Sequence, residues 1–148
     1  MCAELSRIIH LPQVNSNTVL ITAAAPTAQS VIPLEILPLG EFDPVYRTPL
    51  DVQQGELPVL PLSIYGALSH AKAADGRDDG VLSGSDFFIY KFDRQQSGLA
   101  GLSFDEGVFG VFGYITEGVE FVPLLTASDV VVEAKVVSGA ERLVRPGV

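Results

Sequence analysis

The side chains best suited to acid–base, nucleophilic or metal chemistry are scarce in this chain. It has one cysteine, Cys2, and two histidines, His10 and His70. One cysteine cannot form an intramolecular disulfide, and a cysteine-based zinc site needs several cysteines. The two histidines lie far apart in the sequence, and neither has neighbours at the spacing typical of metal ligands. We therefore expect no metal ion and no cofactor.

Acidic residues outnumber basic ones. The 148 residues include 18 Asp and Glu but 9 Lys and Arg, which gives a net charge of −9. Such a surface repels phosphate backbones and anionic lipid headgroups, so we expect neither nucleic acid nor a membrane surface as a partner. No apolar run approaches the roughly 20 residues of a membrane-spanning helix. We also expect no signal peptide, because the first ten residues lack a basic leader and an apolar region.

Short apolar runs separated by turn residues indicate a mainly β protein. Ten prolines and fourteen glycines interrupt these runs, and 47% hydrophobic residues are enough for a packed core. We expect strands at 18–24, 31–37, 57–68, 86–92, 108–115 and 129–137 and exposed loops at 73–83 and 93–103. The run 57–68 contains Pro58 and Pro61, so its pairing should begin only near Leu62.

The segment 116–125 differs from the strands because its apolar residues recur with helical spacing. Thr116 is a suitable N-cap for a helix that begins here. Pro123 lies too deep for the first turn, which predicts a short or distorted helix.

Two adjacent phenylalanines in the run 86–92 raise a geometric question. Successive side chains of a strand point to opposite faces, so Phe87 and Phe88 cannot both enter one core. The second ring therefore needs a different environment from the first.

Three blocks of residues follow one another at consistent spacing along the chain. They contain Leu68, Ser69, Ala71 and Ala73, then Gly84, Ser85, Phe87, Phe88 and Ile89, and then Gly107, Val111, Phe112, Gly113, Tyr114, Glu117 and Gly118. Together they resemble the cyclophilins, which are barrel-type peptidyl-prolyl isomerases. The phrases IPLEILP and GELPVLPLSIYGAL look like the divergent cyclophilins of the thylakoid lumen of chloroplasts and cyanobacteria.

The resemblance covers residues 31–146 and fades before them, which predicts a divergent segment 1–30 and a cyclophilin-like domain 31–148. It implies a mainly β fold, a cyclophilin-like antiparallel barrel that is truncated or rearranged at its N-terminus. The chain has no room for the two strands and the helix that precede the catalytic arginine of the family. Because an opened barrel exposes strand edges, either residues 1–30 form substitute strands or another protein covers the gap.

The resemblance also answers the question of the paired rings. In cyclophilins the first Phe packs inside the barrel and the second forms the floor of a groove for a substrate proline. This assigns Phe87 to the core and Phe88 to the groove; the alternative is that Phe88 packs beneath the loop 93–103. Phe104 and Phe109 align near the tryptophan and the histidine of the groove, and core packing is the alternative for both.

The polar residues of the groove depart from the family pattern. Ala71 keeps its place, but the following asparagine is replaced by Lys72 and the glutamine of the Phe–Phe strand by Asp86. These two charges could form a salt bridge across the groove. His70 occupies a methionine-like position, and we interpret it as a partly buried structural residue rather than as an acid–base group.

The catalytic group of the family is an arginine. It donates a hydrogen bond that weakens amide resonance, the source of the barrier of about 18–20 kcal/mol to rotation about an Xaa–Pro bond. Arg7 in the stretch LSRII is the candidate, although Leu5 replaces the expected phenylalanine and the downstream glutamine is not reproduced. The alternative is that Arg7 is an ordinary surface arginine.

Three functional hypotheses follow from the resemblance. The first is a degenerate cyclophilin-like protein, a binding, assembly or structural subunit of a photosynthetic complex of the thylakoid lumen. Its partner would be the lumenal face of a photosystem or a proline-containing segment. The second is an active peptidyl-prolyl isomerase of the lumen, and the third is a chaperone that binds proline-bearing segments without isomerising them.

Overall fold

The computed structural model describes residues 9–14, 18–23, 31–46, 50–73, 80–91 and 107–142. The strands are β1 (Ile9–Val14), β2 (Thr18–Ala23), β3 (Val31–Pro33), β4 (Ala67–Lys72), β5 (Val81–Tyr90), β6 (Val111–Tyr114) and β7 (Val130–Val131). Three short 3₁₀ helices accompany them: η1 (Val52–Gln54), η3 (Val119–Leu124) and η4 (Ala140–Arg142). The mainly β class predicted from the sequence is confirmed.

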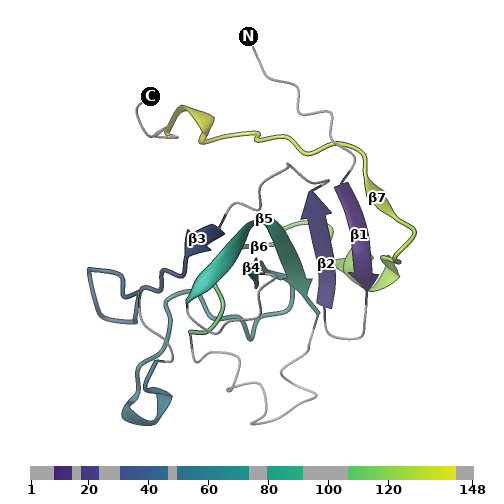
Figure 1. Ribbon diagram of the computed structural model, residues 1–148. Helices are drawn as coiled ribbons and strands as arrows, with labels where there is room; N and C mark the ends of the chain where they lie inside the picture. The colour runs from purple at the N-terminus through teal and green to yellow at the C-terminus, as the bar shows by residue number, and fades with distance from the viewer. Residues whose placement is uncertain are drawn as a thin grey trace.

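The strands form one seven-stranded sheet in the order β6-β4-β5-β2-β1-β7, and β3 pairs with the first part of β5. Every pairing is antiparallel. The long strand β5 lies at the centre, and β6 and β7 lie at opposite ends of the order (Figure 1). The sheet is consistent with a cyclophilin-like barrel, but it does not close into a complete ring.

Residues 9–23 contribute two strands to this sheet. β2 pairs with β5, where Ile21 lies opposite Phe87, and β1 pairs with both β2 and β7. The described part of residues 1–30 thus contributes strands to the same sheet as the predicted domain, and the two alternatives for the front of the barrel stay predictions. β1 was not predicted, because Pro12 interrupts its apolar pattern. The register shifts between His10 and Gln13, around this proline, and such an irregularity is where a strand tolerates a residue without an amide hydrogen.

Four of the expected strands are shorter or shifted in the structure: 31–37 is reduced to β3 and 108–115 to β6, and two others change more. In the run 57–68 the strand β4 begins only at Ala67, and the run 129–137 contributes only Val130–Val131 to β7. β5 is longer than expected, because it begins at Val81 within the predicted loop 73–83. The apolar residues around Pro58 and Pro61 lack regular pairing, since proline donates no hydrogen bond to a ladder.

The predicted helix near 116–125 is present as η3. It is a 3₁₀ helix capped by Gly118, at φ +76°, rather than by Thr116, and it contains Pro123. Tighter 3₁₀ turns are common in short helical pieces, which agrees with the expected distortion.

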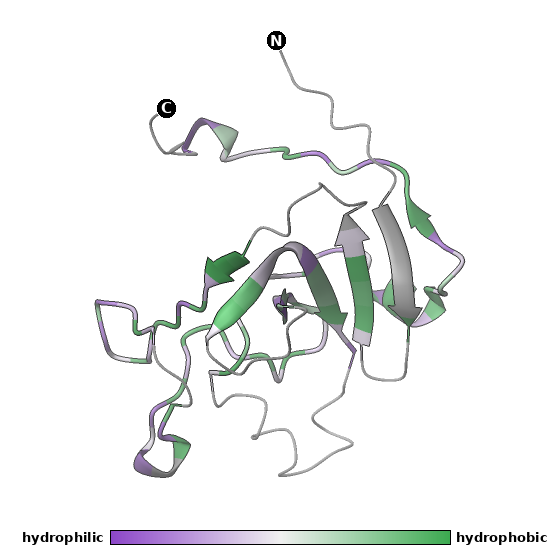
Figure 2. Ribbon diagram, viewed as in Figure 1, coloured by the Kyte–Doolittle hydropathy of each residue, from purple (hydrophilic) through white to green (hydrophobic). Residues whose placement is uncertain are grey.

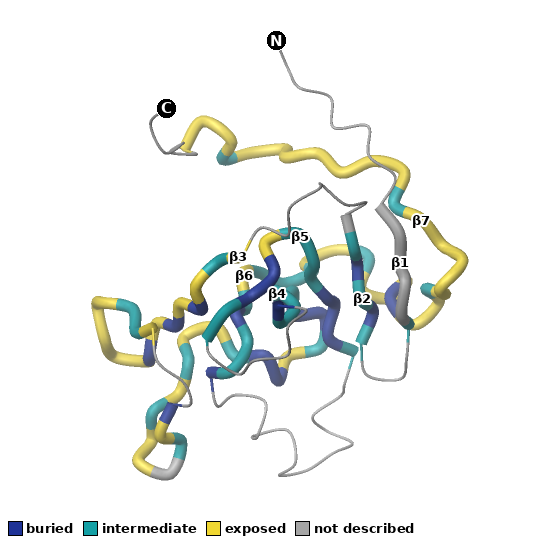
Figure 3. The backbone as a smooth tube through the Cα atoms, viewed as in Figure 1, coloured by how far each residue is buried: buried dark blue, intermediate teal, exposed yellow. Residues whose placement is uncertain are grey.

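Both faces of β5 are covered by apolar side chains. Val19, Ile21, Ile89 and Val122 form a cluster on one face. Leu62, Ala67, Phe88 and Tyr90 form a second cluster on the other face. Leu34, Ile36, Leu50 and Leu82 form a third cluster near β3. The buried parts of the chain lie along the central strands, whereas the segment after β7 is exposed (Figure 3).

Candidate functional site

β5 carries the paired phenylalanines on opposite faces, as strand geometry requires. Phe87 lies opposite Ile21 of β2 and packs, partly buried, against the cluster of Val19 and Ile89. Phe88 lies opposite Leu20 and is 8% exposed. The ring assigned to the groove is thus the more buried of the two.

Phe88 belongs to a cluster that gathers most of the residues assigned to the groove. The rings of Phe88 and Phe109 meet edge to face with centroids 5.5 Å apart, and Ala71 packs against the same cluster. The Lys72 ammonium lies 5.5 Å from the centre of the Phe109 ring, within cation–π range. The structure brings Ala71, Lys72, Phe88 and Phe109 together, and the Phe88 ring is buried where Phe109 packs against it. Their role in substrate binding stays a prediction.

A glycine lets the Phe109 segment approach the sheet. A Cβ atom at Gly110 would lie 2.5 Å from the Leu82 side chain, and the Gly110 carbonyl accepts a 3.0 Å hydrogen bond from the His70 amide. Close contact between backbone and core is a common reason for glycine at such a position. The location of Phe109 over Phe88 therefore depends on a residue without a side chain.

Asp86 is held by serine hydroxyls of its own strand. Its Oδ2 accepts hydrogen bonds from Ser83 Oγ at 2.6 Å and from Ser85 Oγ at 3.3 Å, and its amide donates to Ser83 Oγ at 3.1 Å. Oδ1 is buried without a hydrogen-bond partner among the described residues. Lys72 pairs with Leu82, four positions before Asp86 along β5. The carboxylate thus contacts these serines, and the salt bridge considered from the sequence is not the arrangement found among the described side chains.

His70 is partly buried, in agreement with a structural role. Its Nδ1 lies 3.2 Å from the Ser83 carbonyl oxygen, to which a protonated Nδ1 donates. Its ring lies 4.8 Å from the ring of Phe112. These contacts hold the imidazole between β4, β5 and β6.

Two of the predicted site residues, Arg7 and Phe104, lie outside the described residues. Within the described part of the chain, no three His, Cys, Asp or Glu side chains gather where they could hold a metal ion. The same part contains no helix with the length and apolar character needed to cross a membrane.

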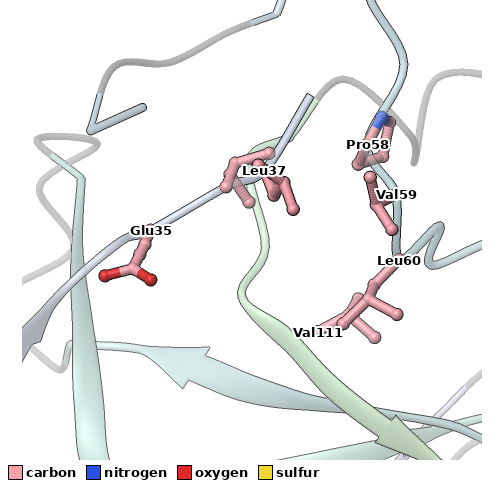
Figure 4. Close-up of a pocket in the computed structure, with 7 residues that line it drawn as sticks. Glu35, Leu37, Pro58, Val59, Leu60 and Val111 are labelled. Carbon is pink, nitrogen blue, oxygen red and sulfur yellow. The ribbon is translucent and has the colours of Figure 1, made fainter. Parts of the chain in front are cut away.

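The sequence analysis missed an apolar hollow beside the Phe88 cluster. Its volume is about 310 Å³, and it is lined by Glu35, Ile36, Leu37, Pro58, Val59, Leu60 and Val111 (Figure 4). Val111 also packs against the cluster of Phe88, so the two features adjoin. The signal that could have revealed it is a pair of apolar, proline-containing stretches, at 31–38 and 57–62, that are too interrupted to form full strands.

The hollow has one charged group in its lining. Glu35 Oε2 accepts a 2.8 Å hydrogen bond from the hydroxyl of Tyr46. This hydrogen bond, together with repulsion between the carboxylate and a phenolate, raises the pKa of Tyr46 above its ordinary value of about 10. The rest of the lining is predominantly aliphatic, so the arrangement suits an apolar ligand with a polar or positive group at one end.

Comparisons with known proteins identify relatives of this chain. No family model matches it. It is 48% identical to the chloroplastic peptidyl-prolyl cis-trans isomerase CYP37 of Arabidopsis thaliana over 115 residues. This matched region covers 78% of this chain and 24% of that protein. It is 39% identical over 115 residues to a putative thylakoid lumen peptidyl-prolyl cis-trans isomerase of Synechocystis, covering 76% of this chain and 29% of that protein.

A third relative is the chloroplastic peptidyl-prolyl cis-trans isomerase CYP38 of Arabidopsis thaliana. It is 30% identical over 118 residues, which cover 78% of this chain and 26% of that protein. The chain thus spans about a quarter of the length of each curated relative it matches. The sequence implied a location in the chloroplast and the thylakoid lumen. The names of these relatives give the same location. The chain is a homologue of the cyclophilin-type peptidyl-prolyl isomerases of the chloroplast and the thylakoid lumen.

Proposed function

We propose that this chain is a cyclophilin-type domain that acts by binding protein, as an assembly or structural subunit of a photosynthetic complex in the thylakoid lumen. The observation that carries the proposal is the burial of Phe88 beneath Phe109. An isomerase must offer its substrate an apolar floor, and this floor is already covered.

Catalysis of prolyl isomerisation needs two things from the protein. It needs a desolvated apolar pocket for the proline ring, and a hydrogen-bond donor that stabilises the twisted amide. Phe88 is 8% exposed and its ring meets that of Phe109 with centroids 5.5 Å apart, so a proline that contacts Phe88 must displace a packed neighbour such as Phe109. Moving a packed aromatic ring loses contacts and lowers the affinity for substrate.

The polar side of the site also favours binding over catalysis. Where the resemblance implies a glutamine, the chain has Asp86, whose carboxylate accepts hydrogen bonds and donates none when ionised. Ser83 and Ser85 already donate to it. This position therefore offers no amide donor to a substrate.

The chain offers an apolar surface suited to a protein partner. The hollow of about 310 Å³ is of the size at which protein pockets begin to bind ligands, and its walls include Leu37, Val59 and Leu60. Leu39 and Leu57 are exposed nearby along the same two stretches. Exposed apolar patches of this kind commonly mark interaction sites. The proposed occupant is a proline-containing segment or the lumenal face of a photosystem.

An isomerase assay separates binding from catalysis. With Xaa–Pro peptides, we expect the chain to leave the isomerisation rate at its uncatalysed value. Immobilised chain should capture one stoichiometric complex from a thylakoid lumen extract. Leu60→Glu, inside the hollow, should abolish the capture, whereas Leu124→Glu, at an exposed position of η3 outside the lining, should preserve it. Robust, cyclosporin-sensitive turnover would contradict the proposal, and capture of many weakly held clients would point to a chaperone instead.

The second candidate function is an active prolyl isomerase, and the names of the three relatives favour it. In this case Arg7 would be the electrophilic catalyst, with Phe88, Phe104 and Phe109 as the pocket. Arg7→Ala should then abolish turnover and leave the thermal midpoint nearly unchanged. An unchanged rate in this variant would exclude Arg7 as the catalyst.

A further inference from the structure

The last strand of the sheet has an unpartnered edge. β7 pairs with β1 and ends the strand order, so no described strand pairs with its other edge. β7 includes only Val130–Val131, and the chain continues past it without a helix until η4 (Figure 1). An exposed edge of this kind can pair with another strand.

The residues after β7 are unusually apolar for an exposed segment. Val132 is 90% exposed, Val136 69% and Val137 91%. Hydrophobic and hydrophilic residues follow one another along this part of the chain (Figure 2). Large aliphatic side chains that are solvated to this degree and lie close together indicate a surface that another strand covers.

The sequence of the segment 131–137 is VVEAKVV. Its chemical types are arranged symmetrically about Ala134: two valines lie at each end, and Glu133 and Lys135 flank the centre with opposite charges. A strand with this pattern is complementary to an antiparallel copy of itself. A two-fold axis through the centre of such a pair is the usual symmetry of homodimers.

We propose that the segment 131–137, of which only Val131 lies in a strand of the structure, pairs with the same segment of a second copy of this chain and so extends β7 in both copies. With Ala134 opposite Ala134, Val132 faces Val136 of the partner subunit. Glu133 faces Lys135 of the partner subunit. Each of these contacts occurs twice because of the two-fold symmetry.

This register places matching side chains on each face of the joined sheet. Residues two apart in a strand share a face, so Val132, Ala134 and Val136 form a wholly apolar face. Glu133 and Lys135 lie on the opposite face, where cross-strand pairs of opposite charge are stabilising. A shift of one residue in register would leave both charges opposite apolar residues, and a shift of two would place either Glu133 or Lys135 opposite its own copy, as a like-charge pair. The charges therefore select one register.

Glu133 and Lys135 are available for such pairing. Both are exposed, and neither forms a salt bridge within the part of the chain that the structure describes. Side chains of one strand that are two residues apart point the same way, whereas the proposed partner presents the opposite charge directly across the ladder.

Sedimentation velocity of the 148-residue chain in about 0.15 M salt, over a range of micromolar concentrations, tests the proposal. We expect a concentration-dependent monomer–dimer equilibrium. Glu133→Lys creates two like-charge pairs in place of two opposite-charge pairs, which should weaken dimerisation by about tenfold. Ala134→Pro removes a backbone donor at the centre and should also weaken it.

The net charge is −9, so a control variant must separate a local effect of Glu133 from general repulsion between the chains. Glu41→Lys changes the net charge by the same amount at an exposed position in a loop. If association depended on general repulsion alone, both variants would associate more strongly than the wild type. The proposal expects Glu133→Lys to weaken association, while Glu41→Lys leaves it unchanged or slightly strengthens it.

A charge-swapped mixture tests the register. Chains with Glu133→Lys and chains with Lys135→Glu should each dimerise poorly, but a mixture of the two should form a heterodimer with two restored ion pairs. Far-UV circular dichroism checks that both variants are folded. A wild-type chain that is monomeric at all concentrations overturns the proposal. So does a dimer that is insensitive to Glu133→Lys and Ala134→Pro, or a mixture that does not restore association.

Discussion

β5 and β7 differ in what surrounds them, although both are rich in apolar residues. β5 has ten residues, pairs with β2, β3 and β4, and contributes Phe88, Ile89 and Tyr90 to the buried set. β7 has two residues, pairs with β1 alone, and continues into exposed valines.

The difference shows that apolar, β-branched composition does not by itself make a core strand. A strand is long and buried where it has neighbours on both edges and covering side chains on both faces. β5 has all four of these. Among the described strands, none pairs with the second edge of β7, and its continuation is solvated for the same reason.

Removal of the Phe88 ring should have the largest effect on the free energy of unfolding, because this ring is buried on the central strand. Phe88→Ala leaves a cavity between Leu62, Ala67 and Tyr90, and such substitutions cost about 3–5 kcal/mol of unfolding free energy. Phe42 is 97% exposed, so Phe42→Ala should change this free energy by less than about 0.5 kcal/mol. Urea denaturation of both variants measures the contrast. Similar losses in the two variants would show that Phe88 is not packed in this core.

Two glycines at positive φ test the same contrast at the level of the backbone. Gly107 has φ +72°, and a Cβ atom there would lie 2.7 Å from the buried Leu50 side chain. Gly139 lies in the exposed segment after β7 with φ +87°, and a Cβ atom there would meet nothing within 4 Å.

Both alanine variants incur the strain of left-handed backbone, about 1–2 kcal/mol. Gly107→Ala must also displace Leu50, and overpacking of a core costs about 1–3 kcal/mol more. The difference between Gly107→Ala and Gly139→Ala in thermal or urea unfolding therefore isolates the core contact. Equal losses would place Gly107 in a region as open as the segment around Gly139.

The centre of this sheet could be predicted from the sequence because its evidence is local. Alternation through 86–92 fixed the opposite faces of Phe87 and Phe88, and turn residues separated the other strands. The alignment of Phe109 with a groove position was also enough to place it beside Phe88. That placement came from the resemblance of three blocks to the cyclophilins, and it did not include the other buried members of the cluster, Leu62, Ala67 and Tyr90.

The periphery could not be predicted in the same way, because its structure depends on what it contacts. The run 129–137 was predicted as a full strand, but only two of its residues have a partner in β1. β1 contains Pro12, which argues against a strand, and its pairing becomes visible only when β2 and β7 lie on either side. The burial of Phe88 likewise depends on Phe109. The strand that follows Phe109, β6, is connected to β5 through β4, and the pairing of β4 with β6 is irregular.

Loss of the contact between Glu35 and Tyr46 should have the smallest effect on the free energy of unfolding, since both side chains are exposed. It joins two stretches that also meet at the isolated bridge between Ile36 and Val45. The hydrogen bond to the carboxylate holds the proton on Tyr46 and raises its pKa. A raised pKa in the folded state means that this contribution to stability is present below about pH 10 and is lost as the pH rises through the raised value.

Absorbance at 295 nm follows this titration among the four tyrosines of the chain. In Glu35→Gln the hydrogen-bond acceptor is weaker and the negative charge is gone, so the Tyr46 transition should move back toward its ordinary pKa. Tyr46→Phe identifies the transition by removing it, and Glu41→Gln, at an exposed position that does not contribute to the raised pKa of Tyr46, should leave it in place. Because the pair is solvated, we expect the midpoint of urea denaturation at neutral pH to be nearly the same in all four proteins. Superimposable titration curves for the wild type and Glu35→Gln would mean that the two side chains do not meet in solution, and that the wall of the hollow at Glu35 is not held by Tyr46.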